Sequence, residues 1–116
     1  MKPKGIRIER LKPLALIERE KLAVATVCNG QLLELELFDP DEEEEARKRH
    51  AETIREVIED WAEEWPEEVA CTPGREVAKE LSGLMKVRSV RDAVKLKFKG
   101  GYCTVAIAKV RTTEVL

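Results

Sequence analysis

The clearest alternation of apolar and polar positions lies on both sides of Asn29-Gly30. Both residues tolerate a positive φ, so the pair favours a two-residue β-hairpin turn. The turn predicts strands over about 22–28 and 31–38, with Val24 opposite Leu35. One face would then carry the apolar residues Leu22, Val24, Leu33, Leu35 and Leu37, and the other Glu34 and Glu36.

A second hairpin is predicted to turn at Gly100-Gly101. This turn pairs apolar residues on one face: Phe98 with Cys103, Leu96 with Val105, and Val94 with Ile107. The other face would hold Lys95, Lys97 and Lys99 with Thr104, Ala106 and Ala108. Upstream, Ser89 and Asp92 have capping-box spacing, so the sequence leaves residues 89–94 open between strand and short helix.

Helical spacing predicts a long helix over about 41–65, started by Asp39-Pro40 and ended by Pro66. Its buried stripe is expected to be Ala51, Ile54, Val57, Ile58, Trp61 and Trp65. A second helix is expected after Thr72-Pro73, with Thr72 as N-cap. Its apolar face would be Val77, Ala78, Leu81, Leu84 and Met85.

The N-terminal region alternates weakly. Ile6 and Ile8 suggest a half-buried strand, and residues 14–17 are either strand or loop. The order hairpin, helix, helix, hairpin predicts an α+β fold in one domain over residues 1–116. We expect a two-layer sandwich, with an antiparallel sheet of four to six strands and both helices on one face.

The amino-acid composition indicates the expected source and cellular location of the protein. Charged residues make up 38% of the chain, with 19 Glu and 11 Lys but one Asn and one Gln, which is typical of a thermophilic source. No apolar run is long enough to span a membrane, and no secretory h-region follows Met1. A cytoplasmic protein is expected.

The net charge of −2 hides a strong polarity along the chain. Residues 34–68 carry −12, whereas residues 1–33 carry +4 and residues 86–116 carry +6. An acidic helix between two basic segments suggests a homo-oligomer in which opposite charges meet. Trp61 and Trp65 are four residues apart, on one helical face. They are either core or a partner interface.

Three cysteines, Cys28, Cys71 and Cys103, are expected at the ends of elements. In a reducing cytosol, the simplest expectation is that they are reduced and buried as small hydrophobic side chains. The alternative is a thiolate site for a metal or an iron–sulfur cluster, if the three converge. The lone His50 lacks an orienting partner and a nucleophile in the sequence, so we assign no catalytic residue.

The lysines of the C-terminal hairpin, Lys95, Lys97 and Lys99, form a basic strand face. Such a face either contacts anions or nucleic acid, or it blocks edge-to-edge aggregation. No dinucleotide fingerprint, P-loop or triad-like arrangement is present. The sequence therefore favours a non-enzymatic interaction or accessory protein that self-associates. The alternatives are a thiolate metal site and nucleic-acid binding.

Residues 71–104 resemble the C-terminal half of a bacterial domain family of unknown function. The resemblance rests on Cys71, on Leu81-Ser82-Gly83-Leu84 and on Gly100-Gly101-Tyr102-Cys103-Thr104. The family usually places His after the Cys-Thr pair, where Val105 stands here. It implies no activity.

A second stretch is similar to the U-type iron–sulfur scaffold proteins. It comprises Cys28-Asn29-Gly30, Phe98-Lys99, Cys103, Ala106-Ile107-Ala108 and Thr113-Glu114. This resemblance implies an iron–sulfur cluster on the cysteines. That family places a helix after its central cysteine, where the present pattern predicts a strand.

Overall fold

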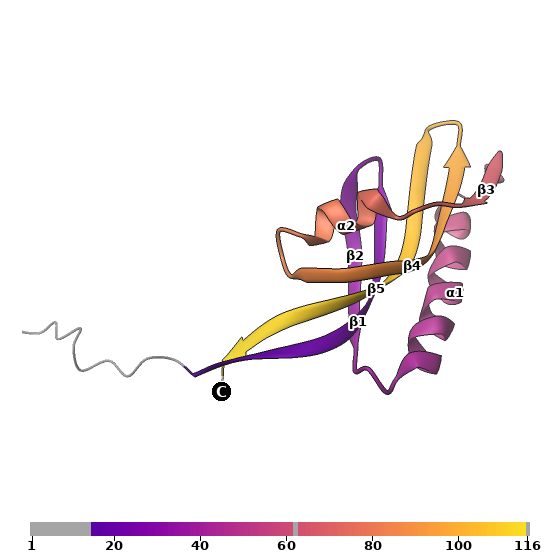
Figure 1. Ribbon diagram of the computed structural model, residues 1–116. Helices are drawn as coiled ribbons and strands as arrows, with labels where there is room; N and C mark the ends of the chain where they lie inside the picture. Colours follow the sequence, from indigo (N-terminus) through magenta and orange to yellow (C-terminus); the bar gives the residue numbers. More distant parts are fainter. Residues whose placement is uncertain (1–14, 62, 116) are drawn as a thin grey trace, which may run out of the picture.

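The computed structural model describes residues 15–61 and 63–115 of the chain (Figure 1). The elements are β1 (Leu16–Cys28), β2 (Gln31–Phe38), α1 (Glu43–Asp60), β3 (Glu68–Cys71), α2 (Arg75–Leu81), β4 (Lys86–Phe98) and β5 (Gly101–Val115). All strand pairs are antiparallel, and the five strands form one sheet in the order β2-β1-β5-β4-β3. The predicted α+β fold with an antiparallel sheet of four to six strands is confirmed. The strand expected at Ile6 and Ile8 lies outside the described residues.

The two hairpins join through their inner strands. β1 and β5 pair without a register shift from Cys28 opposite Cys103 to Leu16 opposite Val115. β2 and β4 stop short of the far end, so residues 16–19 pair only with residues 112–115 in the described part of the chain. These residues form a two-stranded arm that projects from the molecule (Figure 1).

The two helices pack on opposite faces of the sheet, and the expectation that both share one face is wrong. α1 covers a cluster that includes Leu22, Val24 and Val105, whereas α2 covers one that includes Ala23, Ala25 and Ala106. These residues alternate along β1 and β5. Central strands buried on both faces have continuous apolar runs rather than strict alternation, and small alanines let α2 approach closely.

Each face has its own apolar cluster. The α1 side buries Leu22, Val24, Ala46, Val57, Leu96, Phe98, Cys103, Val105 and Ile107. The α2 side buries Ala23, Ala25, Val27, Val77, Leu81, Ala93, Ala106, Ala108 and Val110. The helices differ in direction as well, because α1 runs along the strands and α2 crosses them (Figure 1).

A bulge at Leu33 overturns the predicted faces of the first hairpin. The pairs Cys28–Gln31 and Val27–Leu32 agree with the prediction, but Thr26 then pairs with Glu34 and Val24 with Glu36. An extra residue on one strand moves every later side chain to the other face. Glu34 and Glu36 therefore lie on the α1 side, where Arg49 Nε is 2.7 Å from Glu36 Oε2.

The second hairpin turns at Lys99-Gly100, one residue earlier than predicted. Leu96 pairs with Cys103 and Val94 with Val105, so the predicted register is wrong by two residues. A shift of two preserves the faces, and the apolar set predicted there does lie on the α1 side. Residues 89–94 belong to strand β4, with a bulge beside Asp92, whose φ is 51°.

Both helices are shorter than predicted. α1 ends at Asp60, because Trp61 leaves the helix to stack on Phe98 with ring centroids 4.6 Å apart. Ala51 and Trp65, expected in the buried stripe, are exposed. α2 begins after Gly74 in a left-handed conformation, so Gly74 and not Thr72 is its N-cap. Among the described residues, no helix is long and apolar enough to cross a membrane.

Candidate association surfaces

The two tryptophans have different environments. Trp61 is half-buried and stacks on Phe98 with an interplanar angle of 11°. Trp65 is 83% exposed and is the most exposed of the large hydrophobic side chains described. Trp61 is thus part of the packing around the core, and only Trp65 of this predicted pair is available to a partner in this structure.

The backbone that carries Trp65 is held in place on both sides. Glu64 N donates to Trp61 O at 2.7 Å, and Glu67 N donates to Lys97 O of β4 at 2.7 Å. Pro66 follows directly and restricts the backbone of Trp65 to extended conformations. Because the backbone is already ordered, binding would cost only the rotamer freedom of the Trp65 side chain.

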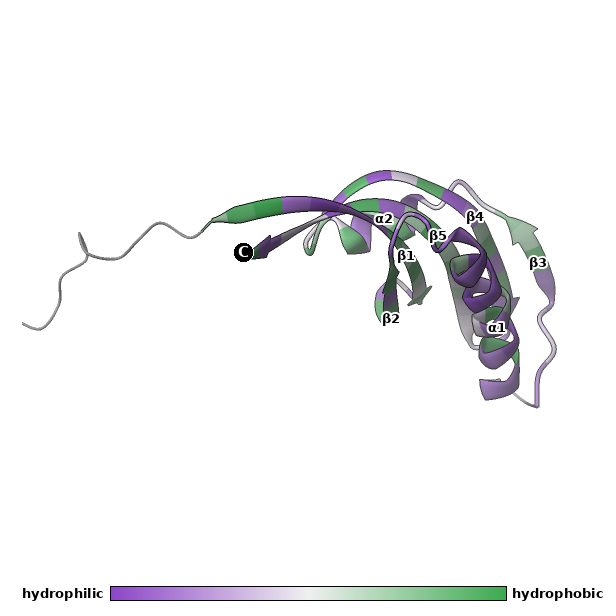
Figure 2. Ribbon diagram, turned by 90° about the horizontal axis from the view of Figure 1, so that it is seen from below, coloured by the Kyte–Doolittle hydropathy of each residue, from purple (hydrophilic) through white to green (hydrophobic). Residues whose placement is uncertain are grey.

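Acidic residues flank this tryptophan along the sequence. We call the segment from Glu59 to Glu68 the acidic turn; its carboxylates belong to Glu59, Asp60, Glu63, Glu64, Glu67 and Glu68. Within residues 15–61 and 63–115, none of these carboxylates forms an ion pair with a Lys or Arg side chain. Most of the α1 ribbon is also coloured hydrophilic (Figure 2).

A groove on the α2 side of the sheet carries positive rather than negative charge. It is open, has a volume of about 920 Å³, and runs between α2 with its following turn and the first half of β4. Apolar groups of the lining come from Pro73, Ala78, Leu84, Met85, Val87 and Val90. We call it the α2–β4 groove.

The charged groups of the α2–β4 groove are all cations. Arg75, Lys86, Arg88 and Arg111 line it, and no carboxylate belongs to the described lining. Glu18 lies beside it and neutralises part of the charge, with Oε1 2.6 Å from Lys86 Nζ and Oε2 3.9 Å from Arg111. Hydrogen bonding to Lys86 lowers the pKa of Glu18. Arg75 and Arg88 are exposed, and no described carboxylate lies within ion-pair distance of either.

The predicted basic face of the last hairpin is partly neutralised. Lys95 Nζ lies 3.3 Å from Glu76 Oε1 of α2 and 4.1 Å from the centre of the Tyr102 ring. Lys97 is exposed and stands opposite Glu68 of β3, and Lys99 lies in the turn. The acidic and basic segments of the sequence therefore meet within one chain at this point. Binding of nucleic acid or another anion through these lysines stays a prediction.

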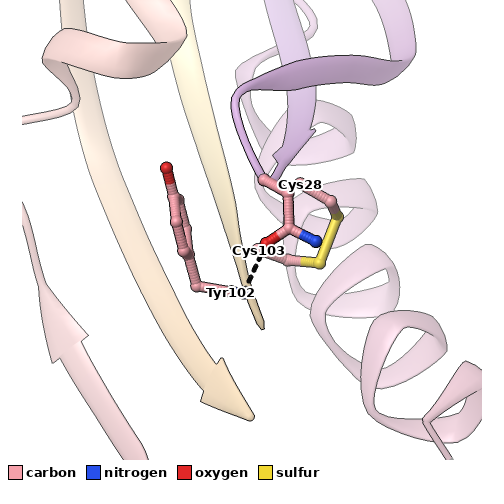
Figure 3. The surroundings of a disulfide bond; sticks show 4 residues. Cys28, Tyr102 and Cys103 are labelled. Carbon is pink, nitrogen blue, oxygen red and sulfur yellow. Dashed lines mark hydrogen bonds between the residues drawn. A yellow bond between two sulfur atoms is a disulfide. The ribbon is translucent and has the colours of Figure 1, made fainter. Parts of the chain in front are cut away.

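Two of the three cysteines come together as a disulfide. Cys28 and Cys103 face each other on β1 and β5, with Cα atoms 4.0 Å apart (Figure 3). The hydrogen bond from Asn29 N to Tyr102 O marks them as a non-hydrogen-bonded pair, the position where antiparallel strands are closest. The expectation of three reduced, buried cysteines is therefore wrong for this structure. The sequence carried no signal that β1 pairs with β5 in this register.

Cys71 does not join them. It is exposed on β3, which is separated from β5 by β4. Within the described residues, no three His, Cys, Asp or Glu side chains are placed to hold one metal ion. The structure thus does not assemble the three-cysteine site that the sequence suggested.

His50 is buried in α1, and its Nε2 is 3.0 Å from Val105 O of β5. A carbonyl oxygen only accepts, so Nε2–H is the donor. This bond fixes α1 to the sheet, and His50 has a structural position here.

The α2–β4 groove was not foreseen from the sequence. Its cations come from α2, β4 and β5, which the fold brings together. The only signal was the positive charge of residues 86–116, which does not indicate where those side chains meet. In comparisons with known proteins, no family model, no curated protein and no solved structure matches the chain.

Proposed function

We propose that this protein is a non-enzymatic interaction domain that associates with copies of itself through Trp65 and the acidic turn. The observation that carries the proposal is an aromatic side chain 83% exposed on a backbone anchored by two hydrogen bonds. Tryptophan is among the residues that contribute most to binding when it is buried at an interface. Large exposed apolar side chains of this kind mark association surfaces.

Charge supports self-association over binding to a generic partner. The acidic turn and the α2–β4 groove belong to one chain and have opposite charges. Such complementarity raises encounter rates and excludes wrong partners. The net charge of only −2 is then the sum of an acidic and a basic surface, which neutralise each other when two copies associate.

We further propose a cytoplasmic protein from a hot environment. The excess of Glu and Lys over Asn and Gln supports a thermophilic source. The Cys28–Cys103 disulfide fits both parts of the proposal, because intracellular proteins of hyperthermophiles are an exception to the rarity of cytosolic disulfides.

Sedimentation equilibrium of the full chain at tens of micromolar tests the association. We expect a mass above that of the monomer, and Trp65→Ala should weaken the association about 30-fold, as loss of a hot spot does. The matched control is Leu33→Ala, because Leu33 is another apolar side chain, 60% exposed, on the edge strand β2. It should leave the association unchanged.

A strict monomer at these concentrations would overturn the proposal. Association that persists unchanged in Trp65→Ala would show that another surface carries it. Circular dichroism and thermal melting of each variant establish that the fold is intact, which we expect because both side chains face solvent.

A further inference from the structure

We infer that the acidic turn of one copy docks in the α2–β4 groove of a second copy, with Trp65 as the anchor. This inference rests on the proposed function and specifies the second surface. The contact is then head-to-tail, because each copy binds one neighbour through its acidic turn and another through its α2–β4 groove.

The size of the groove and its apolar residues support this pairing. The groove, of about 920 Å³, has apolar groups from α2, its following turn and β4. Leu84, on that turn, is 64% exposed, and Met85 beside it is half-buried. An aromatic anchor seated on apolar groups and surrounded by polar ones is the usual anatomy of a protein interface.

The charges match in the same arrangement. In the acidic turn, Trp65 is flanked along the sequence by Glu63, Glu64 and Glu67. On the groove, Arg75 and Arg88 are exposed and have no described carboxylate within ion-pair distance. Docking would bring these two sets together in a partly desolvated rim, where arginine suits carboxylates because it can donate two parallel hydrogen bonds.

A chain cannot place its Trp65 in its own groove. The acidic turn is tied to Lys97 near one end of β4, whereas the groove lies along residues 86–90 near the other end. The seven residues from Val90 to Lys97 span at most roughly 23 Å, less where β4 bulges between Arg91 and Val94, and Trp65 is 83% exposed rather than seated in this groove. The contact therefore has to form between copies. A heterologous contact of this kind generates a ring if it closes and an open chain if it does not.

A mixing experiment tests the head-to-tail mode. The first variant, Trp65→Ala, lacks the anchor and keeps the groove. The second, Arg75→Glu with Arg88→Glu, lacks the basic rim and keeps the anchor. Each variant alone should remain monomeric at a concentration where the wild-type chain associates. An equimolar mixture should form a 1:1 heterodimer, measured by sedimentation velocity, because one intact turn and one intact groove are then present.

The outcomes separate the inference from the proposed function. A monomeric wild-type chain would overturn the proposed function. A wild-type chain that associates, with variants that do not combine on mixing, would overturn only the head-to-tail docking. A charge exchange gives an independent check. A chain with Glu63→Lys and Glu64→Lys in its acidic turn should bind the wild-type groove more weakly than the wild-type chain does. The same chain should bind the groove of the Arg75→Glu, Arg88→Glu variant at least tenfold more tightly than a chain with the wild-type turn does. Failure of that exchange would also count against the docking.

Discussion

Asn29 and Tyr102 hold each other through two hydrogen bonds. Asn29 N donates to Tyr102 O at 3.0 Å. Tyr102 N donates to Asn29 Oδ1 at 3.0 Å, which is the dashed line in Figure 3. Asn29 also has a φ of 51° in the β1–β2 turn. One residue thus shapes the first hairpin and fixes it to the start of β5, next to the disulfide.

Replacing Asn29 separates these two contributions. Asn29→Gly keeps a residue that tolerates positive φ and loses the side-chain bond, so we expect a loss of about 1 kcal/mol in the free energy of unfolding. Asn29→Ala loses the same bond and keeps a Cβ in the left-handed region without the polar side chain that makes Asn tolerant of it, so its loss should exceed that of Asn29→Gly by about 1–2 kcal/mol. Urea unfolding measures both, and Gln31→Ala, at the exposed start of β2, is the control. Equal losses for the two Asn29 variants would contradict this account.

Gly101 is coupled to the same side chain. A Cβ built at Gly101 would lie 2.2 Å from Asn29 Oδ1, and its φ of +147° disfavours other residues. We expect Gly101→Ala to cost about 1–3 kcal/mol. In the Asn29→Gly background the cost should fall, because the clashing side chain is gone, and a double-mutant cycle measures the difference.

Gly83→Ala serves as the control for that cycle, because nothing described lies within 4 Å of a Cβ there. It should change stability little. If Gly101→Ala costs the same in both backgrounds, the clash with Asn29 is not its cause.

The Cys28–Cys103 disulfide should contribute strongly to stability. It joins residues 75 apart in sequence, so it restricts the unfolded chain considerably. Replacing both cysteines with Ala should cost about 2–4 kcal/mol. The matched control is Cys71→Ala, an exposed free cysteine, which should change little. A dithiol reductant should lower the melting temperature of the wild-type chain and leave the double variant unaffected; the same response from both would contradict the prediction.

Acid should destabilise the protein through its ion pairs. Hydrogen bonds lower the pKa of Glu43 (from Arg91), of Asp39 (from Lys21) and of Glu18 (from Lys86). A carboxyl group whose pKa is lower in the folded state contributes stability that is present above its unfolded pKa of about 4. That contribution is lost as the pH falls through the lower, folded-state pKa.

Urea unfolding between pH 7 and pH 2.5 measures this dependence. Glu43→Gln should reduce its slope, whereas Glu44→Gln, which replaces a carboxylate without an ion-pair partner in the described part of the chain, should not. High salt should weaken the dependence, because all three carboxylates face solvent. A slope that Glu43→Gln leaves unchanged would exclude the Glu43–Arg91 pair as a contributor.

Local patterns in the sequence were sufficient for both hairpins and both helices, but they did not predict β3 and left residues 89–94 open. Asn29-Gly30 placed the first turn, and the apolar set of the second hairpin placed its buried face correctly despite the wrong register. Helical spacing located α1, although the helix begins slightly later than predicted. It also ends earlier, because Trp61 packs on Phe98 instead of continuing the helix. The sequence grouped Trp61 with Trp65 and did not predict that one is half-buried and the other exposed; a partner role for Trp65 stays a prediction.

The sequence by itself determined the two antiparallel hairpins, the two helices and the separation of charge along the chain, because these depend on neighbouring residues. Only the tertiary structure decided the contacts between distant residues. The bulge at Leu33 turned Glu36 toward Arg49, and the pairing of β1 with β5 joined Cys28 to Cys103. Ala25 and Ala106 are buried on the second face of the sheet, where α2 packs opposite α1. These outcomes depend on register and on which faces meet, and a one-residue shift changes both while local spacing stays the same.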